Sequence, residues 1–366
     1  MMTRMSVAVI GGGNGARAFA GHLSLKGTQV RLLSSFPQEL EAIKRSGTIN
    51  VTGVVEGEGK VEVCDDNFEA ISDARLILVV VPAFAHAPIA RAVAPYLKDD
   101  HIVVLNPGRT GGALEFSHVI KSANCEAKVH VAETQTLLYA CRIEGPTGVR
   151  INGIKKEVAV AAFPADNTTI VLSELNKYFP QFKPVPSVLY TSLMNIGAVF
   201  HPTTVLLNAG RIESGETFEF YRDGMTPAVT TVLEKVDEER CAIARALDVP
   251  ISSALEWLQS AYGVNETTLR SALINNPAYQ GIKAPTSLKV RYLLEDVPTG
   301  LIPLTSLGEL AGINTPTCRA VVDLACAALS HNFWDEGRTL EKLGLKGMSK
   351  KELHEYLQHG VSCRGK

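Results

Sequence analysis

A glycine-rich turn near the start of the chain constrains its fold more than any other feature. The apolar run Val7–Ile10, typical of a buried strand, leads into Gly11 and Gly13, and the helical stretch Ala16–Leu25 follows. In a strand–turn–helix unit of this kind the first glycine permits the tight turn, the second lets a pyrophosphate approach the backbone, and a small third residue lets helix and strand pack closely. The start of the helix adds amides and the positive end of a dipole. We therefore predict a dinucleotide site, in preference to an ordinary turn, made by Gly11, Gly13, Asn14, Gly15 and Ala16.

Short apolar runs separated by helical stretches continue through the first half of the chain. This succession predicts a Rossmann-type α/β fold, a doubly wound and mostly parallel sheet with helices on both faces. We expect further strands at Val30–Leu33, Leu76–Val81, Ile102–Leu105, Val129–Val131 and Val158–Ala162, and a small hairpin from Asn50–Val54 and Lys60–Cys64. The proline-rich stretch Pro180–Pro186 is the natural boundary, so the dinucleotide-binding domain is expected to span residues 1–185.

The second half of the chain shows helical periodicity and no strand-like alternation of any length. Apolar residues recur one helical turn apart, as in Val229, Val232, Leu233, Val236, Ile243 and Leu247 and again in Val321, Leu324, Ala325 and Leu329. Such spacing gives each helix one apolar face to bury. We therefore predict an all-α substrate domain over residues 186–366, ending in an amphipathic tail near Lys350–Leu357.

Composition limits the classes of partner. The chain has 366 residues and a net charge of −2 with no cationic cluster, so nothing favours nucleic acid or a membrane surface. The N-terminal apolar run is too short for a signal peptide, and no segment approaches a membrane span. Seven scattered cysteines lack metal-site spacing, so we expect reduced thiols, no metal and a cytoplasmic protein. The expected partners are small molecules, and a homodimer is left open.

The end of the second strand bears on the choice of cofactor. NAD-binding domains carry an acid there that binds the ribose hydroxyls, whereas this chain has Ser34 and Ser35, and its first acid is Glu39. The two hydroxyls could receive a 2′-phosphate, helped by the nearby cations Arg31, Lys44 and Arg45. We therefore predict NADP, while NAD stays open because serines also accept a plain ribose.

Reduction of a carbonyl or an imine also needs a group that moves a proton, and histidine suits this because its ordinary pKa is about 6.5. Most of the nine histidines have ordinary surroundings; His22, for example, is expected on a helix surface. His201 differs because it lies in the apolar stretch Met194–Pro202, where an unpaired polar group is costly. The alternative is a core histidine satisfied by its neighbours.

Over nearly its whole length the sequence resembles the opine dehydrogenases, the octopine/nopaline dehydrogenase family. The matching segments are Val80–His86, Asn106–Gly112, Ala132–Thr134, Asn195–Thr203, Arg291–Leu301, Leu307–Gly308 and Thr315–Pro316. Enzymes of this family reduce, with NAD(P)H, the imine formed between an amino acid and a 2-oxo acid. Their fold pairs a Rossmann domain with a helical domain, as expected above.

The resemblance implies roles for individual residues. His201 would be the catalytic acid/base and Asp296 the partner that orients its ring. Arg291 would bind substrate carboxylates, its alternative being an ion pair with Glu295 one helical turn away. Asn195 would orient the substrate or the nicotinamide, and Tyr292 would contact the substrate. The cofactor would also contact residues of the matching segments, namely Val81, Pro82, Ala83, Asn106 and Glu133.

Two other functions remain open. A reductase of the ketopantoate or 6-phosphogluconate type has the same two-domain plan but relies on a lysine, and Ser187–Gly210 contains none. A non-catalytic dinucleotide sensor would lack the proton-handling pair, whereas His201 and Asp296 are both present.

Overall fold

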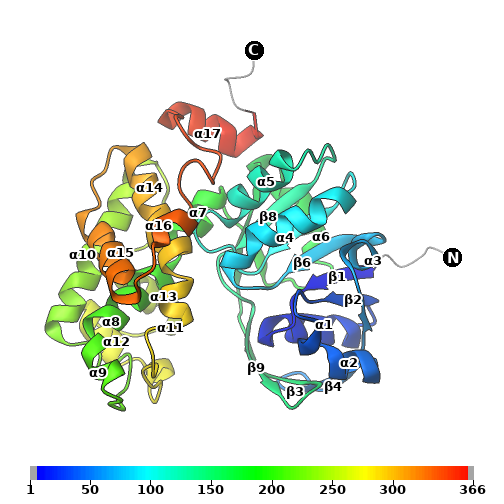
Figure 1. Ribbon diagram of the computed structural model, residues 1–366, viewed down its shortest axis with the longest axis horizontal. Coiled ribbons are helices and arrows are strands. Elements are labelled where there is room, and N and C mark those ends of the chain that lie inside the picture. Colours follow the sequence, from blue (N-terminus) through cyan, green and yellow to red (C-terminus); the bar gives the residue numbers. More distant parts are fainter. Residues whose placement is uncertain (1–5, 362–366) are drawn as a thin grey trace. The chain divides into compact units, whose positions relative to one another are not determined.

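The computed structural model describes residues 6–361 and divides into two compact units (Figure 1). Unit 1 runs to Ser192 and takes up the chain again from Glu352, and unit 2 is Leu193–Lys351. The boundary between the two units therefore falls after Ser192, later than the expected residue 185. The C-terminal helix α17 (Lys350–His359) joins unit 1 almost entirely, instead of ending the helical domain, because the Tyr356 ring packs 4.8 Å from Phe163 and His359 pairs with Asp166.

Unit 1 contains an eight-stranded sheet in the order β12-β11-β8-β7-β6-β1-β2-β5. All neighbours are parallel except β11, which runs antiparallel to β8. The strands are β1 Ser6–Ile10, β2 Val30–Leu33, β5 Glu62–Val63, β6 Ala74–Val79, β7 Ile102–Leu105, β8 His130–Thr134, β11 Val158–Phe163 and β12 Phe182–Pro184. The helices are α1 Asn14–Leu25, α2 Glu41–Ser46, α3 Asn67–Ile71, α4 His86–Val93, α5 Gly112–Ser122, α6 Thr168–Leu175 and α7 Val188–Leu193, which crosses into unit 2. The predicted Rossmann-type sheet is confirmed.

A second sheet of four strands packs on α1. It consists of β3 Thr48–Gly53, β4 Gly57–Lys60, β9 Tyr139–Glu144 and β10 Gly148–Ile154. β3 and β4 form a hairpin, but its second strand ends at Lys60, and Glu62–Val63 of the predicted second arm pairs with β2 in the main sheet. Sequence patterning did not predict β9 and β10.

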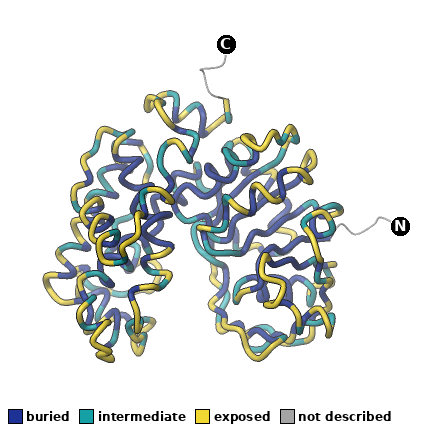
Figure 2. The backbone as a smooth tube through the Cα atoms, viewed as in Figure 1, coloured by how far each residue is buried: buried dark blue, intermediate teal, exposed yellow. Residues whose placement is uncertain are grey.

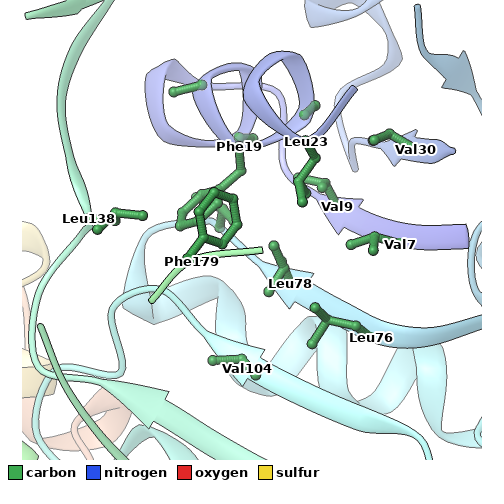
Figure 3. Packing of buried hydrophobic residues seen from close by; sticks show 14 of the residues in the cluster. Val7, Val9, Phe19, Leu23, Val30, Leu76, Leu78, Val104, Leu138 and Phe179 are labelled. Atoms are coloured by element: carbon green, nitrogen blue, oxygen red, sulfur yellow. The ribbon is translucent and has the colours of Figure 1, made fainter. Parts of the chain in front are cut away.

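Apolar side chains from both sheets and from α1 form one core. Figure 3 shows Phe19 and Leu23 of α1 above Val7 and Val9 of β1, with Leu78 and Val104 on the neighbouring strands. Continuous apolar runs are expected wherever both faces of a strand are covered, and Figure 2 shows the buried strands of unit 1 in dark blue. His22, expected on the surface of α1, lies in this interior with its Nδ1 atom 3.0 Å from the Tyr139 hydroxyl.

Unit 2 is helical, as predicted. Its helices are α8 Ile196–Leu207, α9 Ala209–Glu213, α10 Pro227–Ala246, α11 Ala254–Tyr262, α12 Leu269–Ile274, α13 Arg291–Leu294, α14 Ile302–Ala311, α15 Pro316–Leu329 and α16 Phe333–Glu336, with a π-helical turn at Val297–Leu301. Between Leu193 and Lys351 the only strand pairing is one isolated bridge, Glu219 to Lys283. No helix within residues 6–361 has the length and apolarity to cross a membrane.

Candidate active site

The glycine turn between β1 and α1 has the geometry that a pyrophosphate needs. Gly11 has a φ of +140°, and a Cβ atom built on it would lie 2.3 Å from the Val80 carbonyl oxygen, so only glycine fits. A Cβ atom built on Gly13 would meet no atom of the described residues within 4 Å, so the backbone here is open. Gly13 is also the N-cap of α1 and has no side chain to occupy the first amides of the helix. Open backbone and helix amides fit an anionic phosphate.

The next three residues hold the turn in place. A Cβ atom on Gly15 would lie 2.9 Å from Val80 Cγ1, and Ala16 is fully buried, so both are small because α1 packs tightly. The Asn14 side chain accepts a hydrogen bond of 2.6 Å from the Ile143 amide of β9. Asn14 therefore ties the second sheet to the turn.

An acid lies beside the turn, contrary to the expectation from the end of β2. The short 3₁₀ helix Pro37–Glu39 brings the Glu39 carboxylate back, so that a Cβ atom on Gly12 would lie only 2.3 Å from Glu39 Oε2. The Ser34 hydroxyl donates to the same oxygen over 2.9 Å. Ser34 is thus already paired with a carboxylate, and Ser35 is exposed. The absence of an acid at the end of β2 therefore does not mean that no acid lies beside the glycine turn.

Two of the three cations expected to assist a 2′-phosphate are engaged elsewhere. Arg31 pairs with Asp73 and Glu62, and Lys44 pairs with Asp65. Arg17, which the sequence did not single out, contacts the turn through its guanidinium. It donates to the carbonyl oxygens of Gly12 (3.0 Å) and Glu39 (2.7 Å), so it holds the acid-bearing segment against the glycine turn.

The remaining predicted cofactor residues follow β6 and β7 or lie in β8. Val81 and Pro82 are half-buried and Ala83 is buried directly after β6. Asn106, after β7, is buried and donates to the Val104 carbonyl oxygen. Glu133 in β8 is fully buried; its carboxylate accepts from the Ala113 amide (2.7 Å) and the Thr191 hydroxyl (2.5 Å). Its surroundings make Glu133 an internal anchor for the start of α5 and for α7.

In unit 2 the structure brings His201 and Asp296 together. His201 lies in α8, and Asp296 directly precedes the π-helical turn. The His201 Nδ1 atom is 2.7 Å from Asp296 Oδ2, and the aspartate side chain is only 2% exposed. The other ring nitrogen, Nε2, is 2.9 Å from the Tyr221 hydroxyl. The His201 ring also stacks on Tyr292, with centroids 4.2 Å apart. A histidine paired with a buried carboxylate has a fixed tautomer and a charge partner for its protonated form.

Matches to known proteins cover nearly the whole chain. Residues 184–329 match the family model of the NAD/NADP octopine/nopaline dehydrogenase α-helical domain, and residues 6–131 match that of the NAD-dependent glycerol-3-phosphate dehydrogenase N-terminus. An opine dehydrogenase of Arthrobacter sp. (strain 1C) is 42% identical over 355 residues, which cover 95% of this chain and 98% of that protein.

The chain belongs to the opine dehydrogenase family.

Membership of the opine dehydrogenases makes the chain an NAD(P)-dependent oxidoreductase that joins an amino acid to a 2-oxo acid by reductive condensation. Family membership therefore favours the opine dehydrogenase reaction over the simple keto acid reductase and the non-catalytic dinucleotide sensor. Solved structures agree in fold: an octopine dehydrogenase with NADH and L-arginine has a TM-score of 0.82 at 24% identity, covering 95% of this chain and 97% of that one. A yersinopine dehydrogenase with bound NADP⁺ has a TM-score of 0.71 at 16% identity, covering 98% and 99%.

Three further residues with roles implied by the family lie close to the dyad in the chain. Arg291 donates through Nε (2.8 Å) and Nη2 (2.5 Å) to Glu295 Oε2, so the ion pair considered above is present. The Arg291 side chain is nevertheless 62% exposed, whereas the Glu295 side chain is 2% exposed. Asn195 is buried at the N-cap of α8, and Tyr292 covers one face of His201.

A cluster of aromatic side chains around His201 escaped the sequence analysis. Tyr221 stacks on Tyr279 with centroids 4.2 Å apart, and Tyr262 packs edge-on against Tyr279 at 5.3 Å. Phe220 packs between Tyr221 and Tyr292. Burial, Tyr292 and Asp296 hold the pKa of the Tyr221 phenol well above its ordinary value. These residues come from a loop and from three separate segments, and no periodicity links them.

Proposed function

We propose that His201 and Asp296 are the proton-handling pair of the reductive condensation. The observation that carries this proposal is the 2.7 Å contact between His201 Nδ1 and a carboxylate that is almost fully buried. The amino group of one substrate attacks the carbonyl of the other to give a carbinolamine, which loses water to give an imine. His201 accepts and returns protons in these two steps, and Asp296 stabilises the protonated ring. The reduced nicotinamide, when bound, supplies the hydride.

We further propose that Arg291 binds a substrate carboxylate. Both substrates carry one, and arginine recognises carboxylates through paired N–H groups. Glu295 holds the guanidinium through Nε and Nη2, and the Arg291 side chain is 62% exposed, so it stays accessible to a substrate. A buried acid that fixes an exposed arginine lowers the entropy lost when the substrate binds. Asn195 and Tyr292 are proposed to line the same substrate site, as the family resemblance implies.

The experiment that tests this function is a matrix of amino acids against 2-oxo acids. NADH or NADPH oxidation is followed with pyruvate, oxaloacetate, glyoxylate and 2-oxoglutarate, each with and without an amino acid. Oxidation that requires both substrates supports the condensation. Turnover with an oxo acid alone would instead assign a simple keto acid reductase.

For the choice of cofactor we propose NADH, in place of the NADPH favoured by the strand end alone. The support is Glu39, whose carboxylate stands beside Gly12 and accepts from Ser34. An acid in this place accepts hydrogen bonds from ribose hydroxyls and repels a 2′-phosphate. Arg17, a cation beside the turn, donates to the backbone carbonyl oxygens of Gly12 and Glu39.

Replacement of Glu39 tests this choice. Glu39→Gln removes the negative charge and keeps the shape of the side chain. The ratio of NADH affinity to NADPH affinity should therefore fall by about tenfold or more, which corresponds to a change of about 1.4 kcal/mol in relative binding free energy. Glu41→Gln removes the same charge from the exposed start of α2 and is the matched control. A preference for NADPH in the unaltered protein, or equal ratios for the two variants, would contradict the role of Glu39.

We also propose a cytoplasmic location. The six cysteines within the described residues are all free, as expected in a reducing compartment. The homodimer remains a prediction.

A further inference from the structure

Both ring nitrogens of His201 are already engaged by protein groups. Nδ1 contacts the buried Asp296, and Nε2 contacts the Tyr221 hydroxyl at 2.9 Å. One face of the ring is covered by Tyr292. A proton can enter or leave an imidazole only at a nitrogen, so exchange with a substrate must use one of these two hydrogen bonds. The Asp296 side chain is 2% exposed and Tyr221 is 6% exposed, so both partners are buried; only the Tyr221 hydroxyl, which both donates and accepts, can pass a proton on to a substrate.

The Tyr221 side chain is held in this position from several sides. Its ring stacks on Tyr279 at 4.2 Å with an angle of 20°, and Phe220 packs edge-on against it at 5.0 Å. The backbone on either side is also fixed. The Phe220 amide donates to the Ile282 carbonyl oxygen over 2.8 Å, and the Gly224 amide donates to the Glu219 carbonyl oxygen over 3.1 Å. Rotation of the phenol away from Nε2 would disrupt this packing.

The Arg211 side chain closes the same turn from the other side. It donates to the Asp223 carbonyl oxygen over 3.0 Å, while the Asp223 carboxylate accepts from the Glu219 amide over 2.8 Å. A catalytic group needs this kind of support, because an error of about 1 Å in its position costs much of its rate effect.

We propose that Tyr221 is a catalytic residue whose hydroxyl carries the proton between His201 and the substrate oxygen. The inference rests on the proposed role of His201 and Asp296, and it adds a third member to that pair. A phenol suits the task because its hydroxyl both donates and accepts a hydrogen bond.

The proton balance of the relay is simple. With His201 neutral, Nδ1–H donates to Asp296 and the Tyr221 O–H donates to Nε2. With His201 protonated, Nε2–H donates to the Tyr221 oxygen, which frees the Tyr221 O–H for the hydroxyl of the carbinolamine.

As the C–O bond of the carbinolamine breaks, the Tyr221 proton passes to the leaving oxygen and makes water. The Nε2 proton passes at the same time to the Tyr221 oxygen. The nitrogen lone pair of the substrate forms the C=N bond, giving a protonated imine, and His201 ends neutral. No stable phenolate forms, which agrees with the raised pKa of the Tyr221 phenol.

Tyr221→Phe tests the relay, because it removes the hydroxyl and keeps the stacked ring. The single-turnover rate of NADH oxidation with both substrates should fall by about 10² or more, as expected for loss of a general acid, while NADH affinity stays nearly unchanged. Tyr279→Phe is the matched control, since it removes a hydroxyl from the ring stacked on Tyr221 and should change the rate by less than about threefold.

A proton inventory in mixtures of H₂O and D₂O separates a relay from mere positioning. Two protons moving together give a curved dependence of the rate on deuterium fraction in the unaltered enzyme, and the residual activity of Tyr221→Phe should give a straight line. A curved line in the variant, or a rate within about threefold of the unaltered enzyme, would overturn the relay. If Tyr221→Phe and His201→Asn both kept their rates, the proposed function itself would fail. If His201→Asn lost activity and Tyr221→Phe did not, His201 would act on the substrate directly and the relay would be overturned.

Discussion

Each unit of the molecule contains a histidine in contact with a tyrosine hydroxyl, and within the described residues the two histidines differ in whether the second ring nitrogen contacts a carboxylate. In unit 1 the His22 Nδ1 atom lies 3.0 Å from Tyr139, and in unit 2 the His201 Nε2 atom lies 2.9 Å from Tyr221. Only His201 has a carboxylate on its second nitrogen, at 2.7 Å. Burial and the nearby charge of Lys26 lower the pKa of His22 to about 4, so that it stays neutral.

The comparison shows what separates a packing histidine from one that can handle protons. A tyrosine hydroxyl satisfies a ring nitrogen in either case, and both phenols have pKa values raised by burial. The carboxylate adds a charge partner for imidazolium, which His22 lacks because its charged neighbour is a cation. We therefore propose that the proton transfer takes place in unit 2, and we expect unit 1 to contribute cofactor binding through the glycine turn.

The largest expected effect comes from Gly13→Val, which separates the tasks of the two units. The backbone of Gly13 is extended (φ −81°, ψ −171°), a conformation that valine adopts, and open space surrounds it. The protein should therefore fold, while the new side chain occupies the place of the pyrophosphate and abolishes cofactor binding. Fluorescence titration with NADH measures the loss. Gly153→Val, also in open space but in β10, is the control and should bind normally; binding by Gly13→Val within a few-fold would refute the turn assignment.

A second prediction compares a buried ion pair of unit 2 with an exposed one. Asp237 pairs with Arg240, whose side chain is fully buried. Asp237→Ala leaves that charge unpaired and should lower the free energy of unfolding by about 3–5 kcal/mol. Glu238→Ala breaks an exposed pair with Lys235 and should cost no more than about 1 kcal/mol. Urea denaturation measures both, and similar losses for the two variants would show that burial of the pair contributes little.

The smallest effect concerns the pH dependence of unit 1. The pKa of His22 is about 4 in the folded protein and about 6.5 in an unfolded chain, so below pH 6.5 only the unfolded state takes up the proton. The free energy of unfolding should therefore fall as the pH falls from about 6.5 to about 4, by at most about 1.4 kcal/mol per pH unit.

Hydrogen exchange of the α1 amides measures this slope. His22→Gln should abolish the part due to His22, and His354→Gln, on the exposed face of α17, should leave it unchanged. Catalytic turnover should be nearly normal in both variants. A large loss of turnover in His22→Gln would break the contrast between the two histidines.

The sequence predicted best what depends on local order. The turn Gly11–Ala16 lies in one strand–turn–helix unit, and its spacing alone defines its geometry. Glu39 returns to the turn through a short 3₁₀ helix with no periodicity, so the distance along the chain from the strand end was misleading. The contact between His201 and Asp296 spans 95 residues and was predicted only through the family resemblance. Tyr221 lies in an irregular loop, where no pattern indicates which way a side chain points.

Burial of single residues was also poorly predicted when it depended on remote segments. His22 lies on a helix whose polar-looking face is covered by β9 and by Phe179, both distant in sequence. The helical periodicity of the C-terminal helix indicates an apolar face but does not indicate which part of the molecule that face packs against. Its contact with Phe163 could therefore not be predicted from the sequence.

The central claim is that His201 and Asp296 act as one proton-handling unit, and a double-mutant cycle tests it most directly. His201→Asn should lower kcat by about 10²–10⁴ and leave NADH affinity nearly intact, because it removes the acid/base and no part of the glycine turn. Asp296→Asn should also lower kcat, and the double variant should be little slower than His201→Asn, since residues that act together are not additive. If the two losses simply multiplied, or if His201→Asn kept near-normal turnover, His201 would be a satisfied core histidine like His22.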